Sequence, residues 1–209
     1  MRYTIITPTI NNPTLVRACK SVENQTCTDW EHIVMIDGVN AYVPEHPQRK
    51  MFHCPHRHND VGNTCRYNAW EYAKGDYVYY LDDDNYLAHH DVLEELKQVT
   101  APWALLPIYR VGRGGTTKNF HMTPAGAEET VRHSPSGWGG HRLFHYPPHG
   151  GWVDVGSLLI RRDIARWTSK SLVCPDAEMA EQLYQTHPGQ DMGHLRPVLI
   201  YQFAKGWKT

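Results

Sequence analysis

The chain has 209 residues, 41% of them hydrophobic, and a formal net charge of −1 at pH 7. This length suffices for one domain with a hydrophobic core. The near-zero net charge excludes a general basic field that would gather nucleic acid, so a nucleic-acid partner remains possible but is not indicated by charge. No apolar run approaches the ~20 residues that a membrane-spanning helix needs.

Two further features bear on location. Arg2 leads directly into a predicted strand, and the start of the chain does not resemble a signal peptide. The five cysteines are scattered and form no CxxC pair, which favours reduced thiols over a disulfide framework. We therefore expect a cytoplasmic protein.

The first hundred residues alternate strand and helix patterns. Strands are predicted at 3–7, 31–36, 51–53, 77–81 and 103–108, and helices from Pro13, at 64–74 and after Asp91. Asn12 and Pro13 suit a helix start, and Gly75 suits the C-terminal cap of the second helix. This rhythm predicts an α/β fold with a mainly parallel sheet and helices on both faces.

The second half of the chain is less regular. Residues 110–151 are rich in Gly, Pro, His and Trp and show little periodicity, which is typical of a functional loop. A strand at 152–161, a helix at 175–187 and a strand at 197–203 follow. Because no segment has the composition of a linker, we expect a single domain over residues 1–209.

Three adjacent acids, Asp82, Asp83 and Asp84, follow the predicted strand at 77–81. Like charges this close need a cation or a special local field. Side chains alternate along an extended strand, so we expect Asp82 and Asp84 to point to one side and Asp83 to the other. Two carboxylates on one side form a hard-oxygen site for Mg²⁺ or Mn²⁺. The alternative interpretation is an exposed acidic turn.

Polar residues follow each of the first four predicted strands, at positions that converge along one edge of a doubly wound sheet. They are Thr7, Pro8 and Thr9 after the first strand, Asp37 after the second, Asn59, Gly62 and Arg66 after the third, and the three acids after the fourth.

Five ordered segments together resemble glycosyltransferase family 2. They are Ile5-Ile6-Thr7-Pro8-Thr9-Ile10-Asn11-Asn12, Ser21-Val22-Glu23-Asn24-Gln25-Thr26, Trp30-Glu31-His32-Ile33-Val34-Met35-Ile36-Asp37-Gly38, Arg66 with Ala73-Lys74-Gly75-Asp76-Tyr77-Val78, and Leu81-Asp82-Asp83-Asp84-Asn85. The resemblance covers residues 3–100 well and the rest loosely. It implies the GT-A fold and a nucleotide-activated sugar as donor.

The resemblance also implies roles for single residues in donor binding. Asp37 would accept a hydrogen bond from the base, with the imide N–H of uracil as a suitable donor. Arg66 would contact the diphosphate or order the acidic loop. Asp82 and Asp84 would hold Mn²⁺ or Mg²⁺, with Asp83 near the ribose or the donor sugar. The remaining residues expected to bind the nucleotide sugar are Thr7, Pro8, Thr9, Asn11, Asn59 and Gly62.

Members of this family invert the anomeric centre, so the resemblance implies one general base on the acceptor side. Alignment of the late helix places Asp176 at that position, although an acid in the first turn of a helix is also favoured by the helix dipole. Asp154 is the competing base and Glu178 the third. His194 is a candidate for an extra metal ligand, with His187 as a further one.

Histidines are abundant, at 14 residues. His53, Cys54, His56 and His58, with Cys65 nearby, suggest zinc, but their spacing matches no standard zinc finger, and we do not expect a zinc site. Other aromatic and histidine side chains of the irregular segment are candidates for the acceptor cleft. They are His121, His133, Trp138, His141, His145, His149 and Trp152.

The leading hypothesis is therefore a metal-dependent, inverting transferase, with residues 1–100 binding a nucleotide sugar, UDP-linked by preference, and 101–209 binding the acceptor. A glycan, a lipid-linked glycan, a protein, a small molecule or a modified nucleobase would supply the acceptor hydroxyl. One alternative is a nucleotidyltransferase, although the loop at 8–12 lacks the glycines such enzymes use. The other is a non-catalytic module that binds nucleotide sugar or carbohydrate, which turnover would distinguish.

Overall fold

A computed structural model of the chain describes residues 3–111, 140–143, 148, 153–164, 166–167 and 175–202. The strands are β1 (Tyr3–Thr9), β2 (Trp30–Asp37), β3 (Arg49–Cys54), β4 (Tyr77–Tyr80), β5 (Tyr86–Leu87), β6 (Trp103–Leu105), β7 (Ile108–Val111), β8 (Gly140–Leu143), β9 (Leu158–Arg161), β10 (Gly189–Asp191) and β11 (Leu199–Gln202). The helices are α1 (Leu15–Glu23), α2 (Asn63–Ala69), α3 (Val92–Glu95) and α4 (Pro175–Thr186), with 3₁₀ turns η1 (Trp70–Tyr72), η2 (Leu96–Gln98) and η3 (Val155–Ser157).

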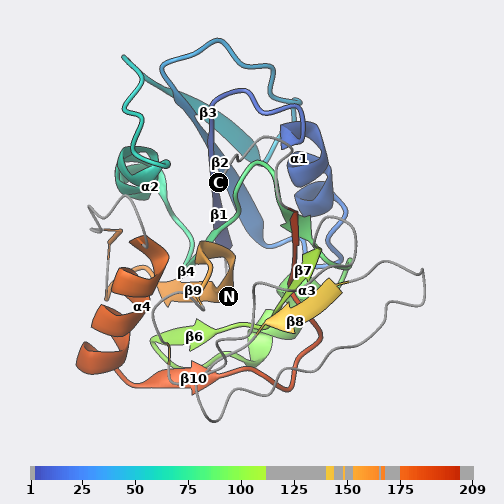
Figure 1. Cartoon of the computed structure of the whole chain (residues 1–209). Coiled ribbons are helices and arrows are strands. Elements are labelled where there is room, and N and C mark those ends of the chain that lie inside the picture. The colour runs from blue at the N-terminus through green and yellow to red at the C-terminus, as the bar shows by residue number, and fades with distance from the viewer. Residues whose placement is uncertain are drawn as a thin grey trace.

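The strands form two sheets (Figure 1). The seven-stranded sheet has the order β10-β6-β9-β4-β1-β2-β3, and the four-stranded sheet has the order β5-β11-β7-β8. In the larger sheet β1 to β4 run parallel, as do β6 and β10, whereas β9 lies antiparallel between β4 and β6. The prediction of an α/β fold with a mainly parallel central sheet is confirmed.

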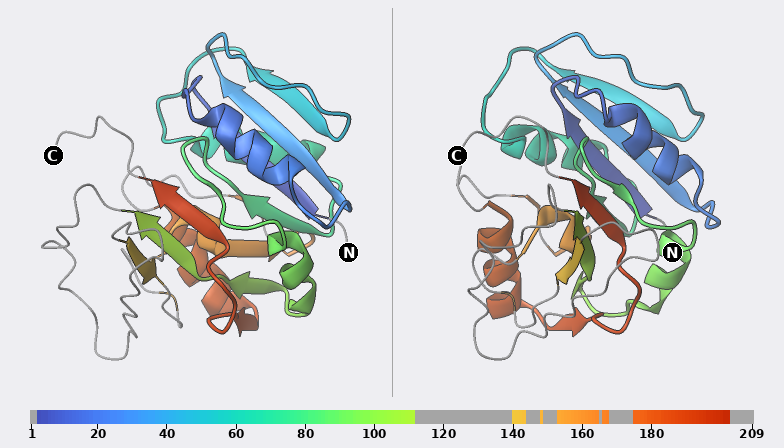
Figure 2. Two further views of the ribbon diagram at one scale, coloured as in Figure 1. Left: turned by 90° about the vertical axis from the view of Figure 1, so that its right-hand side faces the viewer. Right: turned by 45° about the vertical axis from the view of Figure 1, so that its right-hand side comes forward.

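Every residue of β1 and β2 is buried, because helices cover both faces of the larger sheet. Alternate side chains serve opposite faces, as strand geometry requires. Ile5 packs in a cluster with Ala18 of α1 and Leu93 of α3. Ile6 packs in a second cluster with Ala69 of α2 and Leu183 of α4. Figure 2 shows α1 in front of this sheet and α2 behind it.

The segment predicted as one strand at 103–108 is divided between the two sheets. β6 belongs to the larger sheet and β7 to the smaller one, and Leu106 and Pro107 lie between them. The strand predicted at 152–161 begins only at Leu158, because η3 precedes it. Apolar pattern alone does not show where a chain changes sheets.

The prediction that Gly75 caps a helix at 64–74 is wrong. α2 ends at Ala69 and continues as η1. The N–H of Gly75 donates to Thr4 Oγ1 at 2.8 Å, and a Cβ on Gly75 would lie 2.5 Å from the backbone nitrogen of Thr4. Glycine is needed here because the chain passes directly against β1 as it enters β4.

The irregular segment predicted at 110–151 contains strand at both ends, since β7 and β8 pair antiparallel. Most candidate acceptor residues lie outside the described residues: His121, His133, Trp138, His145, His149 and Trp152. The side chain of His141 is likewise not described. In the described ranges, no helix combines the length and the apolar composition needed to cross a bilayer.

Candidate active site

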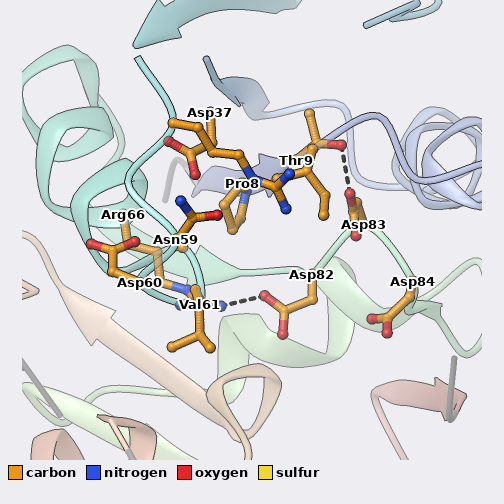
Figure 3. A pocket seen from close by; sticks show the side chains of 13 residues that line it. Pro8, Thr9, Asp37, Asn59, Asp60, Val61, Arg66, Asp82, Asp83 and Asp84 are labelled. Atoms are coloured by element: carbon orange, nitrogen blue, oxygen red, sulfur yellow. Dashed lines mark hydrogen bonds and ion pairs between the residues drawn. The ribbon is translucent and has the colours of Figure 1, made fainter. Parts of the chain in front are cut away.

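The polar residues that follow β1, β2, β3 and β4 meet around one cavity of about 400 Å³ (Figure 3). Its lining consists of Pro8, Thr9, Ile10, Asp37, Arg57, Asn59, Asp60, Val61, Gly62, Arg66, Asp82, Asp83 and Asp84. The volume is in the range of small-molecule sites. The convergence expected from the strand order is therefore found, at the carboxyl ends of parallel strands.

The three acids lie on a turn rather than on an extended strand. β4 ends at Tyr80, and the N–H of Asn85 donates to the carbonyl of Asp82 at 3.1 Å. The prediction that the strand continues through the acids is therefore wrong. Figure 3 shows Asp82 directed toward Arg66 and Asp83 toward Thr9, with Asp84 apart from both. The acidic turn is nevertheless no plain surface loop, because all three carboxylates line the cavity.

Arg66 joins α2 to the acidic turn. Its Nη2 lies 2.5 Å from Asp82 Oδ1, its Nη1 donates to the carbonyl of Val61 at 2.9 Å, and its guanidinium lies 5.1 Å from the ring centre of Trp167. Burial lowers the pKa of Arg66, but the charge and hydrogen bond of Asp82 outweigh burial and raise it. Arg66 is thus a fixed cation at the edge of the cavity.

Asp83 is held by polar neighbours. Thr9 Oγ1 donates to Asp83 Oδ2 at 2.5 Å, and Asn12 Nδ2 lies 3.4 Å from Asp83 Oδ1. Burial raises the pKa of Asp83, and these hydrogen bonds offset part of that effect.

Asp84 carries the clearest sign of a cation site. Burial, followed by the charges of Asp82 and Asp83, raises the pKa of Asp84 to about 7. Burial and neighbouring negative charges both disfavour the ionised form of a carboxyl group. A bound cation offsets both effects, and so stabilises the ionised carboxylate in place of a proton. The carboxylates of the acidic turn, with oxygen donors only, therefore fit Mg²⁺ or Mn²⁺.

Asp37 ends β2 and is buried. Its Oδ1 accepts the backbone N–H of His58 at 3.0 Å, and His58 Nδ1 lies 2.7 Å away from the same oxygen. Gly38 makes this approach possible: its φ is +62°, and a Cβ there would lie 2.1 Å from the backbone nitrogen of Arg57. The loop after β3 is therefore pressed against the end of β2.

The candidate bases lie outside the cavity lining. Asp176 is in the first turn of α4, and burial raises its pKa. The charge of Asp82 raises this pKa further and that of Arg66 lowers it, so α4 brings Asp176 within electrostatic range of their ion pair. Asp154 Oδ1 accepts the N–H of Gly156 at 2.9 Å and so caps η3. Glu178 is exposed on α4.

Besides the candidate bases, three expected site residues lie outside the cavity lining. Thr7 is fully buried, and its hydroxyl lies 2.9 Å from His32 Nε2. Asn11 has a φ of +68° and an exposed side chain beside the backbone of Tyr42. His194 is exposed on the loop between β10 and β11, outside the residues that line the cavity.

Comparison with known proteins identifies the family. The model of "Glycosyl transferase family 2" matches residues 4–166. The chain belongs to glycosyl transferase family 2. No curated protein matches the chain.

Solved structures share the fold of this family 2 chain. S. aureus TarS 1–349 in complex with UDP-GlcNAc has a TM-score of 0.67 at 15% identity, covering 99% of this chain and 60% of the TarS 1–349 chain. The mannosyltransferase PcManGT from Pyrobaculum calidifontis, in complex with GDP-Man and Mn²⁺, has a TM-score of 0.61 at 14% identity, covering 98% and 58%. The chain thus spans about 60% of the TarS structure. These likenesses confirm the expected GT-A fold.

Four residues that line the cavity of this family 2 chain were not anticipated: Ile10, Arg57, Asp60 and Val61. The sequence did contain a signal for Asp60, because an Asp just before a helix commonly accepts hydrogen bonds from the N–H groups of the first helical turn. Its Oδ2 accepts from the backbone and the hydroxyl of Thr64, at 2.8 and 2.5 Å. Val61 has a φ of +52°, which a β-branched residue rarely adopts and which pattern cannot predict.

Proposed function

We propose that this chain transfers a sugar, with inversion, from a nucleoside diphosphate sugar to an acceptor hydroxyl. Asp82 and Asp84 would hold Mg²⁺ or Mn²⁺. The observation that carries the proposal is the cavity in which the end of β2, the cation Arg66 and the acidic turn meet. Structures of similar fold bind UDP-GlcNAc in TarS and GDP-Man with Mn²⁺ in PcManGT.

A UDP-sugar is the preferred donor in this proposal. Asp37 ends β2, which β1 separates from β4 and the acidic turn, and it accepts from His58 mainly through Oδ1. A carboxylate has about four acceptor positions and no donor, so Oδ2 retains capacity for the imide N–H of uracil. The cavity that contains Asp37 and the three acids is also lined by Thr9, Asn59 and Gly62.

The diphosphate would lie in the cavity beside the Arg66–Asp82 ion pair and the other acids of the acidic turn. A divalent cation bound there supplies charge neutralisation for the departing nucleoside diphosphate. Arg66 adds a fixed positive charge, because its guanidinium is anchored by Asp82 and Val61. Asp83, oriented by the Thr9 hydroxyl, would face the ribose or the donor sugar.

Inversion requires one displacement at the anomeric carbon. The acceptor oxygen forms its bond to that carbon as the bond to the diphosphate oxygen breaks, and the acceptor proton passes to a base. Asp176 is favoured as this base because burial raises its pKa, which makes its carboxylate a better proton acceptor. Asp154 is the alternative, but its carboxylate already caps η3.

In this scheme residues 1–100 bind the donor and residues 101–209 bind the acceptor within one domain. The acceptor class and the cytoplasmic location stay predictions. His194, which is exposed on the loop between β10 and β11, likewise stays a candidate third ligand.

The test is release of nucleoside diphosphate from a panel of nucleotide sugars with Mn²⁺. Wild-type protein should release it from a UDP-sugar, and Asp84→Ala should abolish release while the far-UV spectrum is unchanged. Asp163→Ala, which removes an exposed acid paired with Arg161, is the matched control and should retain activity. Donor binding by the wild type without release, with every acceptor tried, would instead indicate a binding module.

A further inference from the structure

A second group of metal-ligand side chains lies behind the donor cavity. It consists of Asp37 at the end of β2, Cys54 at the end of β3, His58 in the loop that follows, and Cys65 in α2. We call these four residues the thiol–imidazole cluster. Asp37 and Cys54 are direct partners in the parallel ladder between β2 and β3, so their backbones fix their separation.

The ligand atoms of Asp37, Cys54 and His58 are already close together, and Cys65 joins them through its contact with Cys54. One atom each of Asp37, Cys54 and His58 lies within 4.8 Å of the other two. The sulfur atoms of Cys54 and Cys65 are 3.6 Å apart, too far for a disulfide bond. Ligands around one tetrahedral zinc ion are separated by about 3.3–3.8 Å, given Zn–N, Zn–O and Zn–S distances of about 2.0–2.3 Å. The sulfur pair fits this geometry as it stands, whereas Asp37 Oδ1 and His58 Nδ1 are hydrogen-bonded at 2.7 Å and would separate to bind the ion.

The surrounding backbone holds the cluster in place. The loop carrying His58 passes so close to Gly38 that no side chain is tolerated there. Asp37, Cys54 and Cys65 are buried, and His58 is largely so. Three of the four ligands therefore come from a strand end or a helix, which gives the preorganisation that structural metal sites have.

The donor set selects a different metal from that of the acidic turn. Two thiols and an imidazole suit zinc, whereas an all-oxygen set suits Mg²⁺ or Mn²⁺. Without a metal, the Cys54 and Cys65 thiols contact each other at 3.6 Å beside the Asp37 carboxylate. A zinc ion would displace the thiol protons and balance the negative charge of the thiolates.

We propose that Asp37, Cys54, His58 and Cys65 bind one zinc ion that ties β2, β3 and α2 together behind the donor cavity. The spacing Cys54-x3-His58-x6-Cys65, completed by the distant Asp37, is not that of a zinc finger, which is why we did not expect a zinc site from the sequence although Cys54, His58 and Cys65 had suggested one. The ion would fix the loop that carries Arg57, Asn59 and Gly62 into the cavity lining.

The first experiment is zinc content. Protein purified without chelator should carry about one zinc per chain by plasma mass spectrometry. Cys54→Ser and Cys65→Ser should lose it. Cys27→Ser is the matched control, because Cys27 is also buried and free but lies in the opposite core cluster. Asp84→Asn should keep its zinc, which separates this site from the proposed Mg²⁺ or Mn²⁺ site.

A second measurement does not depend on whether the cysteine variants fold. Metal-stripped wild-type protein titrated with Co²⁺ should develop the thiolate-to-cobalt charge-transfer band at one equivalent, and Zn²⁺ should abolish it. Zn²⁺ should also raise the Tm of the stripped protein, since a ligand that binds only the folded state stabilises it. Wild-type protein with no zinc and no cobalt band would overturn the proposal, as would a Cys54–Cys65 disulfide found by mass spectrometry in unreduced protein.

Discussion

The guanidinium of Arg66 lies 2.5 Å from the carboxylate of Asp82, and this ion pair connects α2 to the acidic turn. Only 5% of the Arg66 side chain is exposed, against 27% for Asp82, so one partner is anchored in the protein and the other reaches the cavity. Trp167 lies under the guanidinium and itself donates to Asn63 at 3.0 Å. The acidic turn is thereby positioned by residues far away in the sequence.

Replacing Arg66 should test this role. Arg66→Met should lower the free energy of unfolding by about 2–3 kcal/mol, less than for a fully buried pair because Asp82 keeps access to water. The free energy of unfolding of Arg66→Lys should lie between those of Arg66→Met and the wild type. Lysine keeps the charge but loses the planar guanidinium that reaches both Asp82 and Val61. Urea denaturation measures both, and equal stability of Arg66→Lys and wild type would show that the geometry of the pair is unimportant.

Removing the charge of Asp84 should remove metal activation. Asp84→Asn should reduce sugar transfer about a hundredfold or more, because the carboxylate that binds the cation is lost. Initial rates over a Mn²⁺ titration, together with calorimetric Mn²⁺ binding, measure the effect. Asp163→Asn serves as the control for loss of an acid elsewhere. Unchanged half-saturation by Mn²⁺ in Asp84→Asn would place the metal at other ligands.

Local pattern predicted the residues of the site better than their geometry. β1 and β2 are continuous apolar runs because both faces are covered, and the polar residues that end them mark the cavity. The acids at 82–84 were recognised, but their turn was not, since alternation along a strand holds only while the strand continues. Contacts that depend on the fold, such as Arg66 over Trp167, have no local signal at all.

The same limit explains the errors in the fold. Gly75 follows a helical pattern and so resembled a cap, whereas its role is set by Thr4, which lies 71 residues earlier. The strand at 103–108 was predicted as one element because both β6 and β7 are apolar. β5 and β10, of two and three residues, are too short to show any periodicity. Each error concerns a contact between distant segments.

Gly75 offers a direct test of contact against capping. Gly75→Ala should lower the free energy of unfolding by about 1–3 kcal/mol, because its Cβ would overlap the backbone of β1. Gly75→Asn separates the two roles: asparagine tolerates the left-handed cap conformation but not this close approach. We expect Asn to be at least as destabilising as Ala in chemical denaturation. A milder effect of Asn than of Ala would restore the capping interpretation.

Asp176 should set the acid limb of the rate profile. Because burial raises its pKa, the carboxylate takes up a proton above the ordinary range of an aspartate, and transfer should fall as pH decreases through that raised pKa. Asp176→Asn should reduce transfer by about 10²–10⁴-fold with donor affinity unchanged. Asp154→Asn is the matched comparison and should retain the acid limb. Loss of the limb in Asp154→Asn alone would make Asp154 the base.

The buried His32 should make stability depend on pH. Arg49 Nε donates to His32 Nδ1 at 3.0 Å, so the neutral ring keeps its proton on Nε2, which faces the Thr7 hydroxyl at 2.9 Å. Burial, then the charges of Arg49 and His46, lowers the pKa of His32 well below 6.5. A second ring proton would point at the guanidinium that now donates to Nδ1.

The sign follows from where the proton binds. Below about pH 6.5 this histidine is protonated in the unfolded chain but not in the folded chain. The free energy of unfolding therefore keeps its full value above that pH and decreases below it, by up to about 1.4 kcal/mol per pH unit. His32→Gln keeps a hydrogen-bonding side chain without the titration. Urea denaturation between about pH 5 and 7.5 should therefore show a shallower pH dependence for His32→Gln than for wild type. His53→Gln, which replaces an exposed histidine on β3, distinguishes loss of the buried ring from loss of any histidine. Parallel curves for wild type and His32→Gln would mean that His32 accepts its proton equally well in both states, which the contact with Arg49 opposes.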